Sequence, residues 1–392
     1  MGEQKVKSIF DFASKELSGS AFWAWVLNEA CVDKNNKNAE AVGKAFLEKL
    51  KVDANDIKAV ETELSIQDDK KKTCRVDIAL LGKEIFKDGK HVLDSKGNTK
   101  RHPIAFIENK HFSTAEVDDV IGQIKRYANP YTHSQPKKVI MTWRHDTNKQ
   151  WEMLNREKQK GICFFSLKNQ DELIRGVSPK SCPIVQAYYD YISKLNTART
   201  RRINDILKKS FFDMSEDVWT EEDSLYEMMY QLTKGLKNDD DKPLRVHVGN
   251  SGSRKWVQAA FCVRENDAKK YRKFFYRLDK DCNQDCKGQL GGYYLRLNCY
   301  TSKPKDKRRI VSRFEKAGIC KKDSADSKLF YFMPGAEEGQ ETTLLKVYIL
   351  PNKNEKNKVG VETVSELNKK LKYVHNNKIF RLAEEAIETL KG

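Results

Sequence analysis

The stretch IAFIENK, residues 104–110, begins with an apolar run and ends in a carboxylate and an ammonium group two residues apart. Its branched and aromatic side chains predict a β-strand. Side chains two positions apart on a strand point to the same face, so Glu108 and Lys110 are expected side by side where the strand leaves the core. A carboxylate at the mouth of an apolar core costs free energy unless something compensates its charge. A divalent metal ion would compensate it.

Similar runs and three helical patterns lie on either side of this stretch. Runs rich in Val, Ile, Leu and Phe predict five strands, at residues 60–66, 75–81, 103–110, 138–143 and 161–167. Apolar residues at helical spacing predict helices at residues 38–50, 117–127 and 8–30. The last is expected as two short helices or one kinked helix, with the break near Ser18, Gly19 and Ser20. Turn signals near Gly89 and Gly97 predict an elaborated hairpin between the second and third strands. This order predicts an α/β domain, with helices on the faces of a mixed-direction sheet.

The second half of the chain has a different pattern and predicts a second domain. A chain of 392 residues is long enough for two domains. A helix from residue 184 runs on past residue 195 or kinks into residues 199–209, so the expected domains are 1–194 and 195–392. Beyond that boundary, helices are expected at residues 223–236 and 364–390, and strands at 256–264, 291–300, 328–333 and 344–350. The second domain is therefore expected to be α+β.

Composition favours a folded protein of the cytoplasm. Hydrophobic residues make up 39% and charged residues 33%, and no stretch has the length of a membrane span or the pattern of a secretion signal. The nine cysteines are an odd number and are scattered. Cys282 and Cys286 lie close together but lack two further ligands at zinc spacing, so a structural zinc site is not expected.

Net charge points to a polyanionic partner. The chain carries +17, of which +12 falls in residues 191–392, and residues 251–320 hold 18 Lys and Arg against 7 Asp and Glu. Such an excess is typical of proteins that bind nucleic acid. The alternative is a generally Lys-rich composition that keeps the protein soluble.

A second carboxylate, Asp77, lies within the apolar run of residues 75–81. If that strand pairs with the strand of Glu108, the two carboxylates meet. Oxygen ligands with no His or Cys nearby in sequence suit Mg²⁺ or Mn²⁺ better than zinc. The expected metal ligands are Asp77, Glu108 and the backbone carbonyl of Asn109.

These motifs together resemble the PD-(D/E)XK nuclease superfamily, which has the restriction-endonuclease-like fold. The superfamily pattern is an Asp in one strand, Glu-x-Lys at the end of the next, and then a helix. The segment from Gln123 to Tyr127 resembles the Gln-x-x-x-Tyr motif of the RecB-like branch, and residues 10–18 resemble the start of a bacterial family of these nucleases. Val76 departs from the pattern, because the motif has Pro there. The resemblance covers residues 8–167.

The resemblance implies a metal-dependent nuclease that hydrolyses phosphodiester bonds, with DNA the expected substrate and restriction or anti-phage defence the expected role. Lys110 would position or deprotonate the attacking water, as general base catalysis requires. Gln123 and Tyr127 would orient the metal ligands or the phosphate.

The third acid of the site is left open between Glu16 and Glu63. The bacterial family carries a site Glu in its first helix, at the position of Glu16. Glu63 and Glu61 share one face of the preceding strand if that strand alternates regularly. Of these two, Glu61 is more simply explained as a solvated side chain.

A basic and aromatic run in the second half supplies candidate nucleic-acid contacts. Lys269, Lys270, Arg272 and Lys273 interleave with Tyr and Phe, which favours phosphate neutralisation combined with stacking on bases. The alternative is an ordinary helix or strand whose rings belong to the core.

Two further functions stay open. One is a nucleic-acid-binding protein that keeps the nuclease fold without cleaving. The other is an effector nuclease that a small molecule or protein activates through the second domain. The sequence also leaves open whether the chain forms a homodimer.

Overall fold

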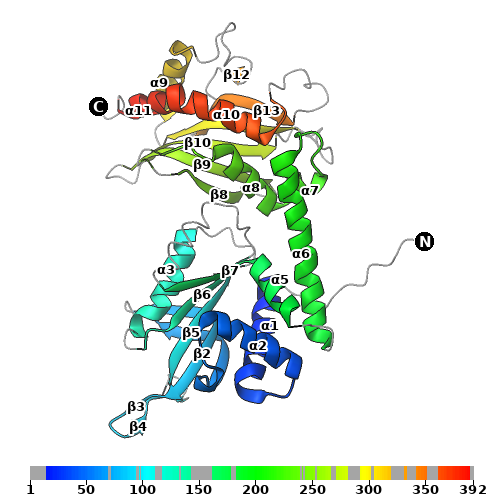
Figure 1. Cartoon of the computed structure of the whole chain (residues 1–392). Helices are drawn as coiled ribbons and strands as arrows, with labels where there is room; N and C mark the ends of the chain where they lie inside the picture. Colours follow the sequence, from blue (N-terminus) through cyan, green and yellow to red (C-terminus); the bar gives the residue numbers. More distant parts are fainter. Residues whose placement is uncertain are drawn as a thin grey trace, which may run out of the picture. The chain divides into compact units, whose positions relative to one another are not determined.

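A computed structural model describes most of the chain (Figure 1). The described residues are 15–68, 72–93, 97, 99–110, 117–131, 134–142, 161–177, 182–238, 241, 243–251, 254–265, 271–280, 292–301, 304–318, 331–332, 341–350 and 361–388. The chain divides into two compact units, Met1–Ala198 and Arg199–Gly392. The division falls inside one continuous helix, α6 (Pro183–Lys208). Within the described ranges, no helix combines the length and apolar character needed to cross a membrane.

The first unit is built on a five-stranded mixed sheet, as the sequence predicts. Its strands lie in the order β1-β2-β5-β6-β7. The pairs β1/β2 and β2/β5 are antiparallel, whereas β5/β6 and β6/β7 are parallel. The strands are β1 (Ala59–Gln67), β2 (Thr73–Glu84), β5 (Arg101–Lys110), β6 (Lys137–Thr142) and β7 (Ile162–Phe165).

Helices cover both faces of this sheet (Figure 1). One face packs against α1 (Lys15–Asn28), α2 (Lys37–Leu50), α5 (Leu167–Gly176) and the first turns of α6, in a core that contains Trp23 and Phe46. The other face packs against α3 (Val117–Ala128), in a second core that contains Phe106. The sheet therefore has one side covered by four helices and one side covered by α3.

Two separate short helices are not present, because α1 runs without interruption through Ser18, Gly19 and Ser20, and residues 8–14 of the expected segment lie outside the described residues. Ser18 and Ser20 are buried, and the Ser20 hydroxyl accepts a hydrogen bond from the side-chain amide of Asn109 on β5, at 2.9 Å. Small polar residues here let the helix approach the sheet and still satisfy a buried amide. Packing thus overrides the weak helix propensity of Ser and Gly.

The long connection between β2 and β5 forms a small hairpin, as expected from its turn signals. β3 (Phe86–Lys87) pairs with β4 (Lys90–His91) in an antiparallel ribbon. Gly89, which lies between them, has a φ of 74°, a left-handed conformation that glycine adopts without steric cost.

The second unit contains a six-stranded antiparallel sheet in the order β12-β13-β11-β10-β9-β8. Its strands are β8 (Arg245–Ser251), β9 (Arg254–Glu265), β10 (Tyr271–Lys280), β11 (Tyr293–Thr301), β12 (Tyr331–Phe332) and β13 (Glu341–Leu350). Its helices are α7 (Glu216–Thr220), α8 (Glu222–Thr233), α9 (Pro304–Lys316), α10 (Val364–Val374) and α11 (Phe380–Glu388). The expected α+β character is therefore present.

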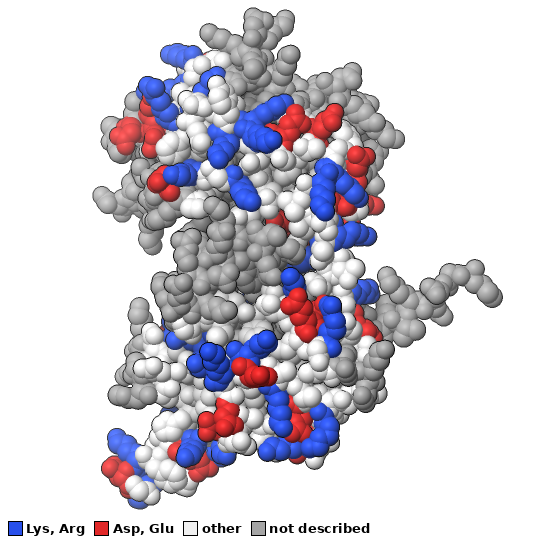
Figure 2. All heavy atoms as spheres, in the orientation of Figure 1, with Lys and Arg blue, Asp and Glu red and all other residues white. Residues whose placement is uncertain are grey.

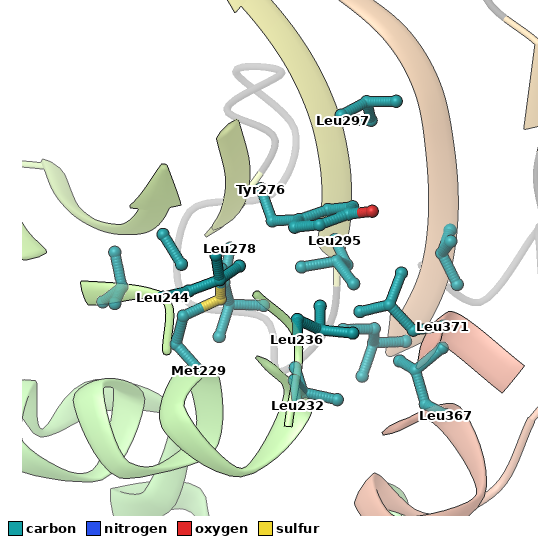
Figure 3. Close-up of a cluster of buried hydrophobic side chains, with 14 of the residues drawn as sticks. Met229, Leu232, Leu236, Leu244, Tyr276, Leu278, Leu295, Leu297, Leu367 and Leu371 are labelled. Atoms are coloured by element: carbon teal, nitrogen blue, oxygen red, sulfur yellow. The ribbon is translucent and has the colours of Figure 1, made fainter. Parts of the chain in front are cut away.

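One apolar core joins the helices of this unit to one face of its sheet. Figure 3 shows Met229 of α8 beside Leu278 of the sheet, with Leu232 of α8, Leu295 of the sheet and Leu371 of α10 in the same cluster. The single helix expected over residues 364–390 is interrupted by a π-helical turn at His375–Ile379. The buried imidazole of His375 forms a 2.9 Å hydrogen bond with the Tyr276 hydroxyl, which anchors that turn to β10.

Candidate active site

Three acidic residues lie at the same level of three adjacent strands. In the β2/β5 ladder Ile78 pairs with Ile107, so one further step places Asp77 opposite Glu108. In the β1/β2 ladder the pairs on either side of Asp77 place Glu63 opposite it. The strand pairing that the sequence left conditional is therefore present, and it brings Asp77 and Glu108 together.

In both β1 and β2, the regular alternation of side chains between the two faces of the sheet is broken at this level. Ala79 packs on the α3 side of the sheet and Ile78 on the other side, as regular alternation requires. Beyond Asp77 the alternation is broken, because Val76 and its partner Leu64 also pack on the α3 side. Glu63 has a φ of 56°, which for a residue other than glycine is uncommon and strained.

This reversal corrects the expectation that β1 alternates regularly through Glu61 and Glu63. Glu61 pairs with Ala79 and so keeps the regular alternation, whereas Glu63 occupies the irregular position. The two glutamates are therefore not equivalent candidates for the third acid.

The residues expected to act together line one cavity of about 260 Å³. Its lining contains Asp77, Glu108, Lys110, Gln123 and Tyr127. β2 and β5 supply the first three, and α3 supplies the other two, one helical turn apart. The α3 face that packs on the sheet is therefore also the face that closes the site.

Glu108 is fully buried. Its Oε1 atom receives the Lys110 ammonium at 2.7 Å and the Gln123 amide at 2.8 Å. Its Oε2 atom is buried and has no hydrogen-bond partner among the described residues. Burial, and after it the negative charge of Asp77, raise the pKa of the Glu108 carboxyl, and Lys110 opposes both, so that the pKa lies at about 7.

Asp77 is held by the backbone of β5. Its Oδ2 atom accepts a hydrogen bond from the Asn109 N–H at 2.7 Å. Burial raises the pKa of Asp77, while this hydrogen bond and the charge of Lys110 lower it. Because Asn109 is itself tied to Ser20 of α1, the position of Asp77 depends on how β5 packs against that helix.

Gln123 and Tyr127 connect the site to the edge of β2. The Gln123 amide lies within hydrogen-bond distance of both Glu108 Oε1 and the Tyr127 hydroxyl. The Tyr127 hydroxyl donates to the backbone carbonyl of Arg75 at 2.8 Å. Burial, and then the charge of Glu108, raise the pKa of Tyr127, so the phenol stays protonated at neutral pH.

Basic residues at the cavity escaped the sequence analysis. Lys72, Arg75 and Arg126 line it together with the acids. Arg126 lies within the Gln-x-x-x-Tyr segment and Arg75 stands two residues before Asp77, so their spacing could have indicated them. Arg75 also forms an ion pair with Glu63, with Nε and Oε2 2.6 Å apart.

The two carboxylates fit a divalent cation, although the described side chains do not form a complete metal site. A buried, unpartnered oxygen on Glu108 and two neighbouring carboxyls of raised pKa are what a bound cation would relieve. Within the described part of the chain, no cluster of three or more His, Cys, Asp and Glu side chains could hold a metal ion. A third ligand would have to come from a rearranged Glu63, from a backbone carbonyl or from Glu16.

Glu16 lies on α1, but its side chain is outside the described residues. On the helix it stands one turn before Ser20, which contacts β5 through Asn109. Its expected role stays a prediction.

The expected nucleic-acid contacts of the second unit are only partly described. Lys269, Lys270 and the side chain of Arg272 fall outside the described residues. Lys273 is on β10, with its ammonium 4.7 Å from the centroid of the Phe275 ring. Phe274, Phe275 and Tyr276 are buried, so these rings belong to the structure of the sheet and are not available to stack on bases.

The chain was compared with protein-family models, with curated proteins and with solved structures, and none of the three comparisons found a match.

Proposed function

We propose that the chain is a metal-dependent nuclease, with Asp77, Glu108 and Lys110 at its catalytic centre and DNA as its substrate. One observation carries the proposal: Asp77 and Glu108 lie opposite each other on β2 and β5, in a cavity that Lys110, Gln123 and Tyr127 complete. The order of strands and helices around them supports a restriction-endonuclease-like fold for the first unit.

The cavity combines the two charge types that phosphodiester hydrolysis needs. Two carboxylates can hold a divalent cation, and the basic side chains of Lys72, Arg75 and Arg126 can hold a phosphate. A bound Mg²⁺ or Mn²⁺ would supply Lewis-acid activation of water and offset the charge on the leaving oxygen. The basic side chains alone would make an anion site and the carboxylates alone a cation site, whereas a nuclease needs both.

Asp77, Glu108 and the Asn109 carbonyl are the proposed metal ligands. A strand residue presents its N–H and C=O groups to the same side, so the hydrogen bond from the Asn109 N–H to Asp77 supports a carbonyl turned toward the same carboxylate. Glu63 is a candidate for the third acid, because it stands in the same row as the two carboxylates and its ion pair with Arg75 is partly exposed.

Lys110 has two roles to fill in turn. Its ammonium lies 2.7 Å from Glu108 Oε1, where it lowers the cost of ionising that carboxyl. With the cation bound, its charge can stabilise the pentavalent phosphate as negative charge builds on the non-bridging oxygens. Gln123 keeps the Glu108 carboxylate oriented by donating to the same oxygen.

A cleavage assay tests the proposal directly. The purified protein is incubated with circular and linear DNA, single- and double-stranded, and with RNA, in Mg²⁺, Mn²⁺, Ca²⁺ or chelator. Cleavage is expected with Mg²⁺ or Mn²⁺ and not with chelator or with Ca²⁺ alone, which is a poorer Lewis acid. Cleavage that persists in chelator would point to a different chemistry. Cleavage only after a small molecule or protein is added would favour the regulated effector.

Substitutions at the site should separate catalysis from folding. Asp77→Asn, Glu108→Gln and Lys110→Ala are each expected to lower the cleavage rate at least ~100-fold while the far-ultraviolet spectrum is retained. Glu61→Gln is the matched control, because it neutralises an exposed acid on β1 and should leave the rate within about twofold, the range of an ordinary surface substitution. Glu16→Gln and Glu63→Gln identify the third acid by which of them is inactive. Substantial cleavage by purified Asp77→Asn would remove this site from the proposal.

A further inference from the structure

A groove in the second unit is lined by the outer face of α9. The helix buries Ile310, Val311 and Phe314 in the core of its unit. Its other face lines a cavity of about 420 Å³ together with α11. The polar and basic part of that lining consists of Arg308, Arg309, Ser312, Arg313 and Lys316.

The basic side chains follow the groove in a line. Arg309, Arg313 and Lys316 are four and three residues apart, which places them on one face of the helix. At 1.5 Å per residue the line spans ~10 Å, room for about three phosphates of a strand that repeats every ~3.4 Å along a duplex. No carboxylate stands in the described lining of this groove.

Acidic residues border the groove on the α11 side. Glu385 pairs with Arg381 at 2.8 Å and with Arg313 at 3.6 Å, and Glu384 and Glu388 line a neighbouring cavity. Figure 2 shows this arrangement at the upper left, where basic side chains over α9 adjoin acidic ones over α11. A polyanion in the groove would be attracted by the basic side chains of α9 and repelled by the acidic side chains of α11. It would therefore lie along α9.

We propose that this groove binds the phosphate backbone of a nucleic-acid strand, as a contact distinct from the cleavage site. The described lining contains no aromatic ring and only one hydroxyl, from Ser312, so it offers little to recognise a base. Contacts to phosphate without contacts to bases hold a strand independently of its sequence. The choice of nucleic acid among polyanions rests on the proposed function.

Binding of a short fluorescent DNA duplex to the full chain, in chelator to prevent cleavage, tests the groove. Arg309→Gln combined with Lys316→Gln should weaken binding ~10-fold or more at low salt and reduce the slope of log affinity against log salt by about 1.8, two phosphate contacts at ~0.9 each. Ser312→Asp should weaken binding without changing the count of basic residues. Lys369→Gln combined with Lys372→Gln removes two exposed charges from α10 of the same unit, and should change both quantities far less.

Three results would overturn the groove. The first is an unchanged affinity and salt slope in the α9 variant, and the second is an equal loss in the α10 control, which would mean that net charge alone matters. The third is displacement of the duplex by ATP at an equal concentration of phosphate groups, which would indicate a nucleotide pocket.

The proposed function has a separate outcome. If the α9 variant binds like the wild type and the protein cleaves DNA, the proposed groove is wrong and the proposed nuclease activity is supported. If binding depends on the groove but no cation supports cleavage, the proposed groove is supported and the proposed nuclease activity is wrong.

Discussion

At the residue scale, ionising the Glu108 carboxyl lowers the stability of the folded protein. Its pKa rises to about 7 because it is buried beside Asp77, whereas an unfolded Glu ionises near 4.3. Between these values the folded state holds a proton that the unfolded state has released, so stability falls as pH rises through this window.

The first prediction follows from that sign. In chelator, Glu108→Gln should gain stability relative to wild type as pH rises from 5 to 8, by roughly 2–3 kcal/mol at 1.36 kcal/mol per pKa unit. Urea unfolding at several pH values measures the difference. A difference that stays constant from pH 5 to 8 would contradict the raised pKa, since Gln cannot titrate.

If Glu108 is a metal ligand as proposed, the same carboxyl makes binding of the cation dependent on pH. A cation must displace the proton from Glu108, so Mn²⁺ affinity should rise up to tenfold per pH unit below pH 7 and level off above it. Titration of the metal-free protein with Mn²⁺, followed by electron paramagnetic resonance, gives this dependence. Glu108→Gln should bind weakly at every pH, and a pH-independent wild type would exclude Glu108 as a ligand.

At the scale of elements, the sequence predicts the sheet of the first unit well but misses its irregularities. The strands of β1, β2, β5, β6 and β7 have clear apolar runs between charged residues, which is why their positions agree. The reversal at Glu63 leaves no such trace, because a left-handed residue other than glycine has no sequence signature. The sequence of β10 fits both a nucleic-acid contact and an ordinary strand, because Lys and Arg are interspersed there with Phe and Tyr rings, and the structure buries Phe274, Phe275 and Tyr276.

The candidate site could be predicted to a similar extent. Asp77, Glu108, Lys110, Gln123 and Tyr127 are at motif spacing, and all of them line one cavity. Ser20 could not be found in advance, because its contact with Asn109 joins positions 89 residues apart in the sequence. Contacts between distant elements depend on how helices pack, which no local pattern records.

The contact between α1 and α2 predicts unequal effects of two glycine substitutions. A Cβ on Gly43 would lie 2.2 Å from the Val26 carbonyl oxygen and 2.7 Å from the Ala30 Cβ, so Gly43→Ala should destabilise the first unit by ~1–3 kcal/mol. Gly122 of α3 has nothing within 4 Å of such a Cβ, so Gly122→Ala should be neutral or stabilise by up to ~1 kcal/mol. Chemical unfolding compares the two, and equal effects would contradict the close approach of the helices.

At the scale of the whole molecule, each unit has its own apolar core. The described clusters of the first unit contain residues up to Leu195, and that of the second unit begins at Ile206. The cooperative unit of unfolding is set by such a core.

Calorimetry should therefore resolve two transitions that respond to different substitutions. Gly43→Ala should lower the midpoint of one transition, and Leu297→Ala, at a fully buried position of β11, should lower only the other by removing ~2–5 kcal/mol of packing. If either substitution shifts both transitions equally, the two units unfold as one.

The paired irregularity in β1 and β2 has a consequence for how the protein tolerates deletions. Removing both Glu63 and Asp77 would bring Thr62 next to Leu64 and Val76 next to Ile78, and would restore unbroken alternation on both strands with their present partners. Removing only one would leave the two strands out of phase. The double deletion should yield soluble folded protein without cleavage, and each single deletion should yield insoluble protein. Glu63 and Asp77 would then be two residues that the pairing of β1 with β2 does not need and that the proposed chemistry does.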